Sequence, residues 1–90
     1  MKFEWDDNKN ATNYKKHKIS FEAASEVFKD SFCKCNFDKN VNNEDRYHAI
    51  GMIRGVLLTV VVHSLPEDDV IRIISARKAE KTEVKYYEEK

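Results

Sequence analysis

The chain has 90 residues, of which 41% are hydrophobic and 36% charged, with only two glycines and one proline. This composition predicts one small, soluble globular domain over residues 1–90 and excludes a disordered, fibrous or two-domain chain. The formal net charge is zero, with sixteen basic and sixteen acidic side chains, so the overall field does not support a nucleic-acid partner held by a strongly basic surface.

The N-terminal sequence and the cysteines indicate a cytoplasmic protein without a membrane partner. No apolar run approaches the ~20 residues of a membrane span, and MKFEWDDNKN lacks the apolar core of a signal peptide. A single residue separates Cys33 from Cys35, a spacing that does not suit an ordinary disulfide. A zinc site would have to recruit two scattered histidines, so we expect no metal or cofactor, and we expect both sulfurs on one face of a strand.

The first third of the chain predicts an extended segment and two helices. Aromatic and polar residues alternate over residues 1–5, as in a short extended segment that packs two aromatic rings. Asp6 or Asp7 is the expected N-cap of a polar helix that ends near residue 17. Ser20 is the expected N-cap of a second helix, SFEAASEVFKD, whose apolar residues recur at helical spacing.

The rest of the chain predicts four strands and a last helix. The strands are expected over residues 32–37, 46–53, 56–64 and 70–75, with an Asn-rich loop over residues 39–45. Short connections make the last three strands antiparallel neighbours, and the nearly all-apolar third strand is expected to be central and covered on both faces. A helix is expected from about Arg77 to Glu89, after a Ser75 cap. The predicted fold class is α+β, in the order α-α-β-β-β-β-α.

The arginines are the strongest candidates for binding an anion, because a guanidinium can hold a phosphate through two parallel hydrogen bonds. Arg72 interrupts an apolar strand, so it is salt-bridged, solvated or facing a cleft. Arg77 is predicted at a helix start, where the dipole favours an anion; a phosphate, Glu44, Asp45 or an acidic partner would each serve. Arg46 either ends a solvated loop or reaches the rim of a cleft.

The other candidates have ordinary structural explanations beside functional ones. His17, after Lys16, is either a helix-end cation that complements the dipole or a functional base. His63 is expected to be half-buried, and Tyr86 and Tyr87 are packing residues or stack on a base. The sequence contains no Gly-rich phosphate loop, H-E-x-x-H or G-x-S-x-G motif. These patterns alone therefore select no activity.

Four short motifs resemble one known family in both order and spacing. They are FEWD at residues 3–6, KH at 16–17, SFEA at 20–23 and IRIISAR at 71–77. With these motifs the sequence resembles the BrnT toxins of bacterial type II toxin–antitoxin systems, from Phe3 to about Glu88. One departure is Lys18, which stands where family members often have glycine.

The resemblance implies a RelE-like fold and a metal-independent ribonuclease that cleaves RNA and inhibits translation. It also implies a BrnA-like ribbon-helix-helix antitoxin that neutralises the toxin, with operator DNA reached only through the antitoxin. An antitoxin dimer would recruit two toxins, which predicts a heterotetramer. The alternative is a non-catalytic RNA- or protein-binding module that acts with a DNA-binding repressor.

Site residues follow from the same resemblance. RNA cleavage without a metal needs a base for the 2′-hydroxyl proton, cations at the phosphate and an acid for the leaving oxygen. The arginines predicted at the scissile phosphate are Arg46, Arg72 and Arg77. The base or second phosphate contact is predicted to be Lys16 or His17, and the weaker candidates for proton transfer are Glu44 and Tyr87.

Overall fold

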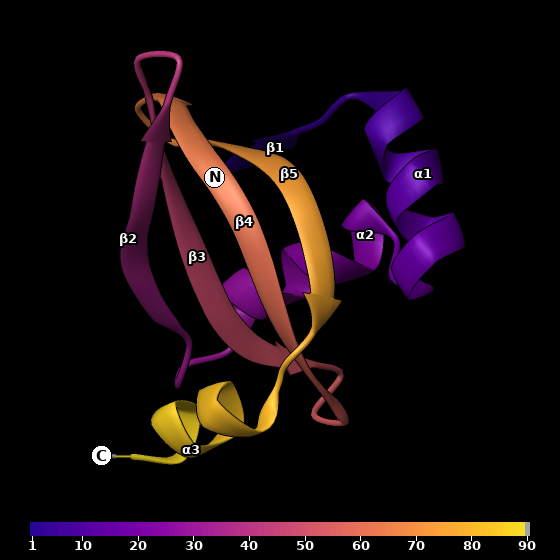
Figure 1. The fold of residues 1–90 in the computed structure, drawn as a ribbon, viewed down its shortest axis with the longest axis vertical. Coiled ribbons are helices and arrows are strands. Elements are labelled where there is room, and N and C mark those ends of the chain that lie inside the picture. Colours follow the sequence, from indigo (N-terminus) through magenta and orange to yellow (C-terminus); the bar gives the residue numbers. More distant parts are fainter. Residues whose placement is uncertain (90) are drawn as a thin grey trace.

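The computed structural model describes residues 1–89; Lys90, the last residue of the predicted domain, lies outside the described residues. The elements in chain order are β1 (Lys2–Glu4), α1 (Asp7–His17), α2 (Phe21–Ala24), the 3₁₀ helix η1 (Ser25–Lys29), β2 (Lys34–Val41), β3 (Glu44–Ile53), β4 (Leu57–Glu67), β5 (Val70–Lys78) and α3 (Lys81–Glu88). The described strands form one sheet in the order β1-β5-β4-β3-β2 (Figure 1). Strand β1 is parallel to β5, and all other neighbours are antiparallel.

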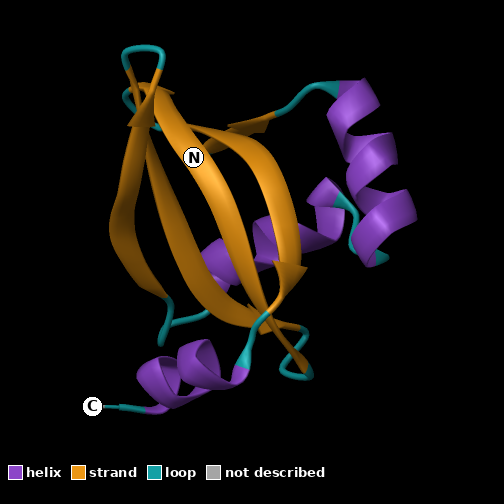
Figure 2. Cartoon of the chain, viewed as in Figure 1, coloured by secondary structure: helices purple, strands orange, loops and turns teal. Residues whose placement is uncertain are grey.

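The α+β class is confirmed, but the prediction of a four-stranded sheet is wrong. The N-terminal extended segment is a fifth strand, because Phe3 pairs with Ile71 at the edge of β5. Helix α1 lies beside β5 and α3 lies below the strand ends, whereas α2 and η1 pack against one face of the sheet (Figure 2). Within the described residues no helix is both long and apolar enough to cross a membrane.

Both predicted caps at the start of the chain are present. The side chain of Asp6 accepts hydrogen bonds from the backbone N–H groups of Asn8 and Lys9, and Ser20 Oγ accepts one from Ala23. Helix α1 ends at Lys18, whose φ of 62° is a left-handed conformation that favours glycine. This conformation explains why a glycine suits the position.

Several predicted boundaries are wrong. The second helix is not continuous, since α2 gives way to η1 at Ser25, whose hydroxyl donates to the carbonyl of Glu22. The Asn-rich loop is instead a two-residue turn at Asn42 and Asn43, both at positive φ, so that β2 and β3 extend toward each other. Strand β5 continues to Lys78, and the last helix therefore begins only at residue 81.

The main core lies between the sheet and the helices α2 and η1. Phe21, Ala24 and Val27 are fully buried against strand residues such as Val61 and Ile73. The 3₁₀ helix lies directly on β3, because a Cβ at Gly51 would come within 2.9 Å of the Val27 carbonyl oxygen. Strand β4 is covered on both faces as predicted, since Val60 and Val61 are 1% and 0% exposed.

Asn13 fastens α1 to the part of β5 that β1 does not reach. Its side-chain amide accepts from the N–H of Ala76 and donates to the carbonyls of Ala76 and Ile19, at 2.9–3.1 Å. The amide therefore makes the hydrogen bonds to the β5 backbone that a neighbouring strand would otherwise make. Helix α1, whose own apolar face is thin, is held through a buried polar side chain.

Candidate active site

The face of the sheet turned away from α1, α2 and η1 carries the predicted arginines; we call it the open face. Strand register places Arg46, Ser64 and Arg72 side by side on β3, β4 and β5. Arg77 lies on the same face, further along β5, where it pairs with Val60. Helices α2 and η1 lie behind the sheet in Figure 1, and α3 lies across one end. The three arginines thus share a face but occupy two separate places on it.

Arg46, Ser64 and Arg72 form what we call the arginine row, and a carboxylate lies over it. Glu44 approaches Arg46 Nε with one oxygen at 3.7 Å and Arg72 Nη1 with the other at 3.4 Å. On its other side Arg72 is held by Glu4, whose Oε2 lies 2.6 Å from both Nε and Nη2. The row can therefore hold an anion between two guanidinium groups, and Glu44 holds that place in the free protein.

Hydrogen bonds satisfy the row only in part. Among residues 1–89, three buried side-chain atoms have no hydrogen-bond partner: Arg46 Nε, Ser64 Oγ and His48 Nδ1. All three side chains are on the open face, and Ser64 is 1% exposed. A buried polar atom without a partner typically costs about 1–3 kcal/mol, and such atoms gather where a ligand supplies the missing bond. The cluster therefore indicates a place for a ligand.

Arg77 has a different environment, and its predicted position at a helix start is wrong. It belongs to β5 because β4 is long enough to pair as far as Lys78. Its guanidinium donates to both carboxylate oxygens of Glu83 on α3, at 2.8 and 2.7 Å. These hydrogen bonds raise the pKa of Arg77 and lower the pKa of Glu83. In the free protein Arg77 fastens the last helix to the sheet.

Tyr87 also fastens α3, at a distance from the arginine row. Its hydroxyl donates to Asp30 Oδ2 at 2.5 Å, and this bond raises the pKa of Tyr87 to about 12. Burial raises the pKa of Asp30, but hydrogen bonds from Tyr87, Met52 and Phe32 leave it below the ordinary value. Glu44, the other weaker candidate for proton transfer, is in contact with the row.

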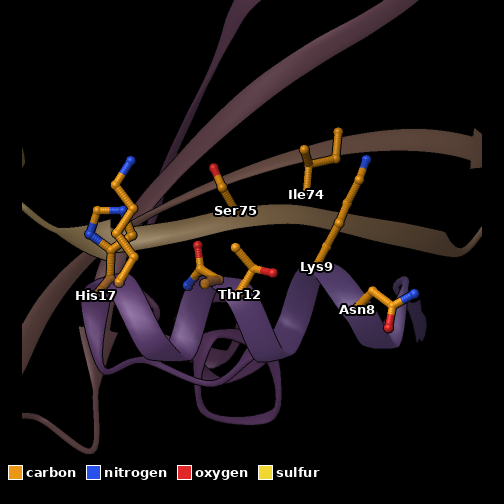
Figure 3. A pocket seen from close by; sticks show the side chains of 8 residues that line it. Asn8, Lys9, Thr12, His17, Ile74 and Ser75 are labelled. Atoms are coloured by element: carbon orange, nitrogen blue, oxygen red, sulfur yellow. The ribbon is translucent and has the colours of Figure 1, made fainter.

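Lys16 and His17 lie outside the open face. They line a groove of about 330 Å³ between α1 and β5, together with Asn8, Lys9, Thr12, Asn13, Ile74 and Ser75. Figure 3 shows Lys9, Thr12 and His17 rising from α1 toward the strand that carries Ser75. Ser75 pairs with Val62 and so belongs to the open face as well. The structure therefore brings Lys16 and His17 to the neighbourhood of the face, across the edge of β5.

The sequence analysis missed His48 and Asp38. His48 lies two residues after Arg46 on β3, and its Nε2 is 3.3 Å from Asp38 Oδ1 on β2. His48 could have been found, because alternation along a strand places it beside Arg46. Asp38 was missed because the predicted strand ends at residue 37, whereas β2 continues to Val41 and alternation from Asn36, the partner of His48, places Asp38 on this face. These residues add a titratable pair to the face.

The cysteines and His63 lie on the helix side of the sheet. Cys33 Sγ and Cys35 Sγ are 4.0 Å apart, as expected for one face, and burial raises the pKa of Cys33 to about 12. His63 is more buried than predicted, at 3% exposed, with its ring against Phe28. Burial lowers its pKa. Within the described chain no three His, Cys, Asp or Glu side chains gather as a metal site would require.

Two kinds of comparison with known proteins, by family profile and by solved structure, find similarity. The family profile described as "Ribonuclease toxin, BrnT, of type II toxin-antitoxin system" matches residues 5–83. The 1.1 Å crystal structure of the ribonuclease toxin BrnT from Brucella abortus is similar, with 28% sequence identity and a TM-score of 0.69. That similarity covers 90% of this chain and 99% of the Brucella chain. Among curated proteins, no sequence matches significantly.

Proposed function

Because the chain belongs to the BrnT family of ribonuclease toxins of type II toxin–antitoxin systems, we propose that it cleaves RNA internally, without a metal ion, and thereby inhibits translation. The observation that supports this most is the arginine row with a carboxylate between its two guanidinium groups, at 3.7 and 3.4 Å. An RNA phosphodiester carries the same charge and presents oxygen acceptors, so it takes the place of Glu44.

We assign to the arginine row the stabilisation of the negative charge that develops on the phosphate in the transition state. When the 2′-oxygen attacks phosphorus, negative charge grows on the non-bridging oxygens, and fixed cations stabilise this state more than the ground state. Arg46 and Arg72 approach from neighbouring sides, and Ser64 Oγ lies between them as a further donor. The leaving 5′-oxygen takes a proton as the P–O5′ bond breaks, which yields a 2′,3′-cyclic phosphate and a 5′-hydroxyl end.

The α1 groove is assigned to the RNA backbone on one side of the scissile bond. Lys16 and His17 face Ser75 across it, and Ser75 also borders the open face. Cations at this position bind a flanking phosphate, an interaction that weakens as salt is added. Arg77 contacts RNA only after Glu83 releases it. Tyr87, with its hydroxyl bonded to Asp30, is assigned to holding α3.

The proposed partner is a BrnA-like antitoxin with a ribbon-helix-helix part, which neutralises the toxin and alone contacts operator DNA. A dimer of that antitoxin with two toxin chains makes a heterotetramer. The assignment of the fold as RelE-like and of the protein to the cytoplasm belongs to the same proposal. Support comes from the family, whose members act in toxin–antitoxin pairs.

The test of cleavage uses purified protein, bacterial RNA with and without ribosomes, and an excess of EDTA. We expect fragments that end in a 2′,3′-cyclic phosphate and begin with a 5′-hydroxyl. Fragments that begin with a 5′-phosphate and need Mg²⁺ would contradict the proposed chemistry, because a metal-activated water leaves those ends. Induced expression alone should stop growth and translation, and coexpression of the antitoxin should restore both.

The alternative, a binding module without catalysis, has one observation in its favour. Three glutamates, Glu4, Glu44 and Glu83, already form ion pairs with arginines of the open face, so the net charge of this face is small. A module of this kind would bind RNA or an acidic partner and leave RNA intact in the assay above. Intact RNA together with saturable binding would favour this alternative.

A further inference from the structure

The central part of the open face is occupied by a histidine that a carboxylate orients. His48 Nε2 lies 3.3 Å from Asp38 Oδ1, and both side chains are about one-third exposed, at 32% and 28%. His48 is on the same face of β3 as Arg46, two residues further along the strand. A histidine bonded to a carboxylate through one ring nitrogen keeps the other nitrogen free to accept a proton.

Two β-bulges flank this histidine. One lies in β2 between Phe37 and Lys39 and brings Lys39, which pairs with Arg46, to the open face beside Asp38. The other lies in β5, where the pairing shifts between His63 and Val62 on β4. Bulges are common beside active sites because they re-aim a side chain that regular alternation would send to the other face. Asp38 itself reaches this face by alternation from Asn36, which pairs with His48.

The free ring nitrogen belongs to the unsatisfied cluster described above. In the described part of the chain, His48 Nδ1 is buried and makes no hydrogen bond, as is also true of Arg46 Nε and Ser64 Oγ. A surface ion pair formed only for stability would leave its second nitrogen in water. Here Nδ1 is buried and makes no hydrogen bond, and it lies beside the row that we assign to the phosphate. A general base for the substrate hydroxyl would occupy this position.

We infer that His48 is a catalytic residue of the RNA cleavage, the base that takes the 2′-hydroxyl proton, and that Asp38 positions its ring. This inference rests on the proposed function and adds to it the identity of the base. His48 Nδ1 accepts the proton as the O2′–P bond forms, and the P–O5′ bond breaks as the leaving oxygen takes a proton from water. The protonated ring then returns its proton to the hydroxide that is left, which restores both the base and the water. Because Nδ1 is buried in the free protein, RNA must open access to it on binding, and catalytic contacts often form only with substrate.

The charged groups around the ring fit this role. Asp38 faces it from β2 and Arg46 lies beside it on β3. Glu83 on α3 is close enough for its pKa to respond to the charge of His48. A positive charge on the ring after proton transfer is therefore compensated by two carboxylates, while Arg46 remains directed to the phosphate.

The test compares the parent chain with His48→Ala, His48→Gln and Asp38→Asn. The matched control is Asp45→Asn, an exposed aspartate on β3 whose side chain accepts a hydrogen bond from Asn40 and, within residues 1–89, from no other group. Single-turnover cleavage of a single-stranded RNA should fall about 10²–10⁴-fold in both His48 variants, the range of a lost general base. Asp38→Asn should lose roughly 10–100-fold, as is typical when the group behind a functional histidine is removed. Asp45→Asn should cleave within about threefold of the parent, since it touches neither the ring nor the row.

Two readouts separate catalysis from a structural role. Binding of the 2′-deoxy analogue, which lacks the attacking hydroxyl, should stay within about threefold in every variant, because the arginine row is intact. Added imidazole should restore part of the rate of His48→Ala and none of Asp45→Asn.

The inference is overturned, and the proposed function stands, if the parent cleaves RNA and folded His48→Gln cleaves it at a rate within about threefold of the parent rate. It is likewise overturned if the rate loss matches a loss of 2′-deoxy RNA binding and imidazole restores nothing. If the parent leaves RNA intact, with and without ribosomes, the proposed function fails and the inference fails with it. His48→Gln keeps a side chain of similar size, so the comparison holds even if His48→Ala is poorly folded.

Discussion

The two ends of the open face both contain arginine–carboxylate pairs, yet they differ in how completely the arginine is satisfied. At one end Arg77 makes two short, parallel bonds to Glu83, which itself caps α3 through the backbone N–H of Glu80. At the other end Glu44 reaches the two arginines of the row only at 3.4 and 3.7 Å. In the same region, and within residues 1–89, buried atoms of Arg46 and Ser64 make no hydrogen bond.

This difference shows that the role of an arginine on a strand is indicated by the groups it pairs with, and not by its occurrence in the sequence. A guanidinium whose donors are matched to a carboxylate already has the ligand that its geometry suits. In the free protein Arg77 holds the last helix, whereas Arg46 Nε and Ser64 Oγ in the row have no hydrogen-bond partner among residues 1–89. The three arginines that the sequence analysis treated alike therefore separate into one that is fully paired and two that we propose for the phosphate.

The largest expected effect is on cleavage by variants of the arginine row. Arg46→Ala or Arg72→Ala should lower the single-turnover rate about 10²–10³-fold, because each removes a cation from the charged transition state. Both side chains are partly exposed, at 25% and 44%, so the free energy of unfolding should change by about 1 kcal/mol or less. Rates and urea denaturation of the same samples check this. Arg54→Ala, at an exposed turn, is the control.

Glu44→Gln should strengthen binding of non-cleavable RNA. The substitution removes the negative charge that occupies the row and leaves the size of the side chain unchanged. The affinity should rise roughly three- to tenfold at low salt, the scale of one partly exposed charge pair. Titration of 2′-deoxy RNA, followed by fluorescence anisotropy, measures this. Unchanged affinity would mean that the phosphate does not replace the Glu44 carboxylate.

Glu83→Gln should change the pH dependence of stability more than cleavage. The folded pKa of Glu83 is lowered, first by its hydrogen bonds to Arg77, so its contribution is complete above the pH where an unfolded Glu titrates, about 4.3. As the pH falls through the lower folded pKa this contribution is lost. The parent should therefore lose more stability than the variant between about pH 5 and 3, by about 1 kcal/mol at most. Equal slopes in urea denaturation would rule out this role for the pair.

Local signals were sufficient for the helix starts and for the core. Asp6 and Ser20 cap because their side chains reach backbone groups two or three residues away, which a sequence displays directly. The covered central strand was likewise visible as an apolar run. Alternation in β3 and β5 placed Arg46 and Arg72 correctly with respect to their own strands.

What could not be predicted depends on pairing between distant segments. The end of β5 is set by the length of β4, through Thr59 opposite Lys78, so the apolar pattern that stops near Ser75 gave a helix start too early. The fifth strand exists because residues near the N-terminus pair with β5 across the whole chain. Asn13, a polar residue on a polar helix, gave no sign that its amide would be buried against Ala76.

The most direct measurement of the central claim follows the side-chain Nε–Hε NMR signals of the four arginines during titration with 2′-deoxy RNA. The account predicts saturable shifts of the Arg46 and Arg72 signals at the lowest RNA concentrations, while the Arg77 and Arg54 signals stay in place. A shift of the Arg77 signal at the lowest RNA concentrations, while the Arg46 and Arg72 signals stay in place, would contradict the account. It would place the phosphate at the α3 end of the face.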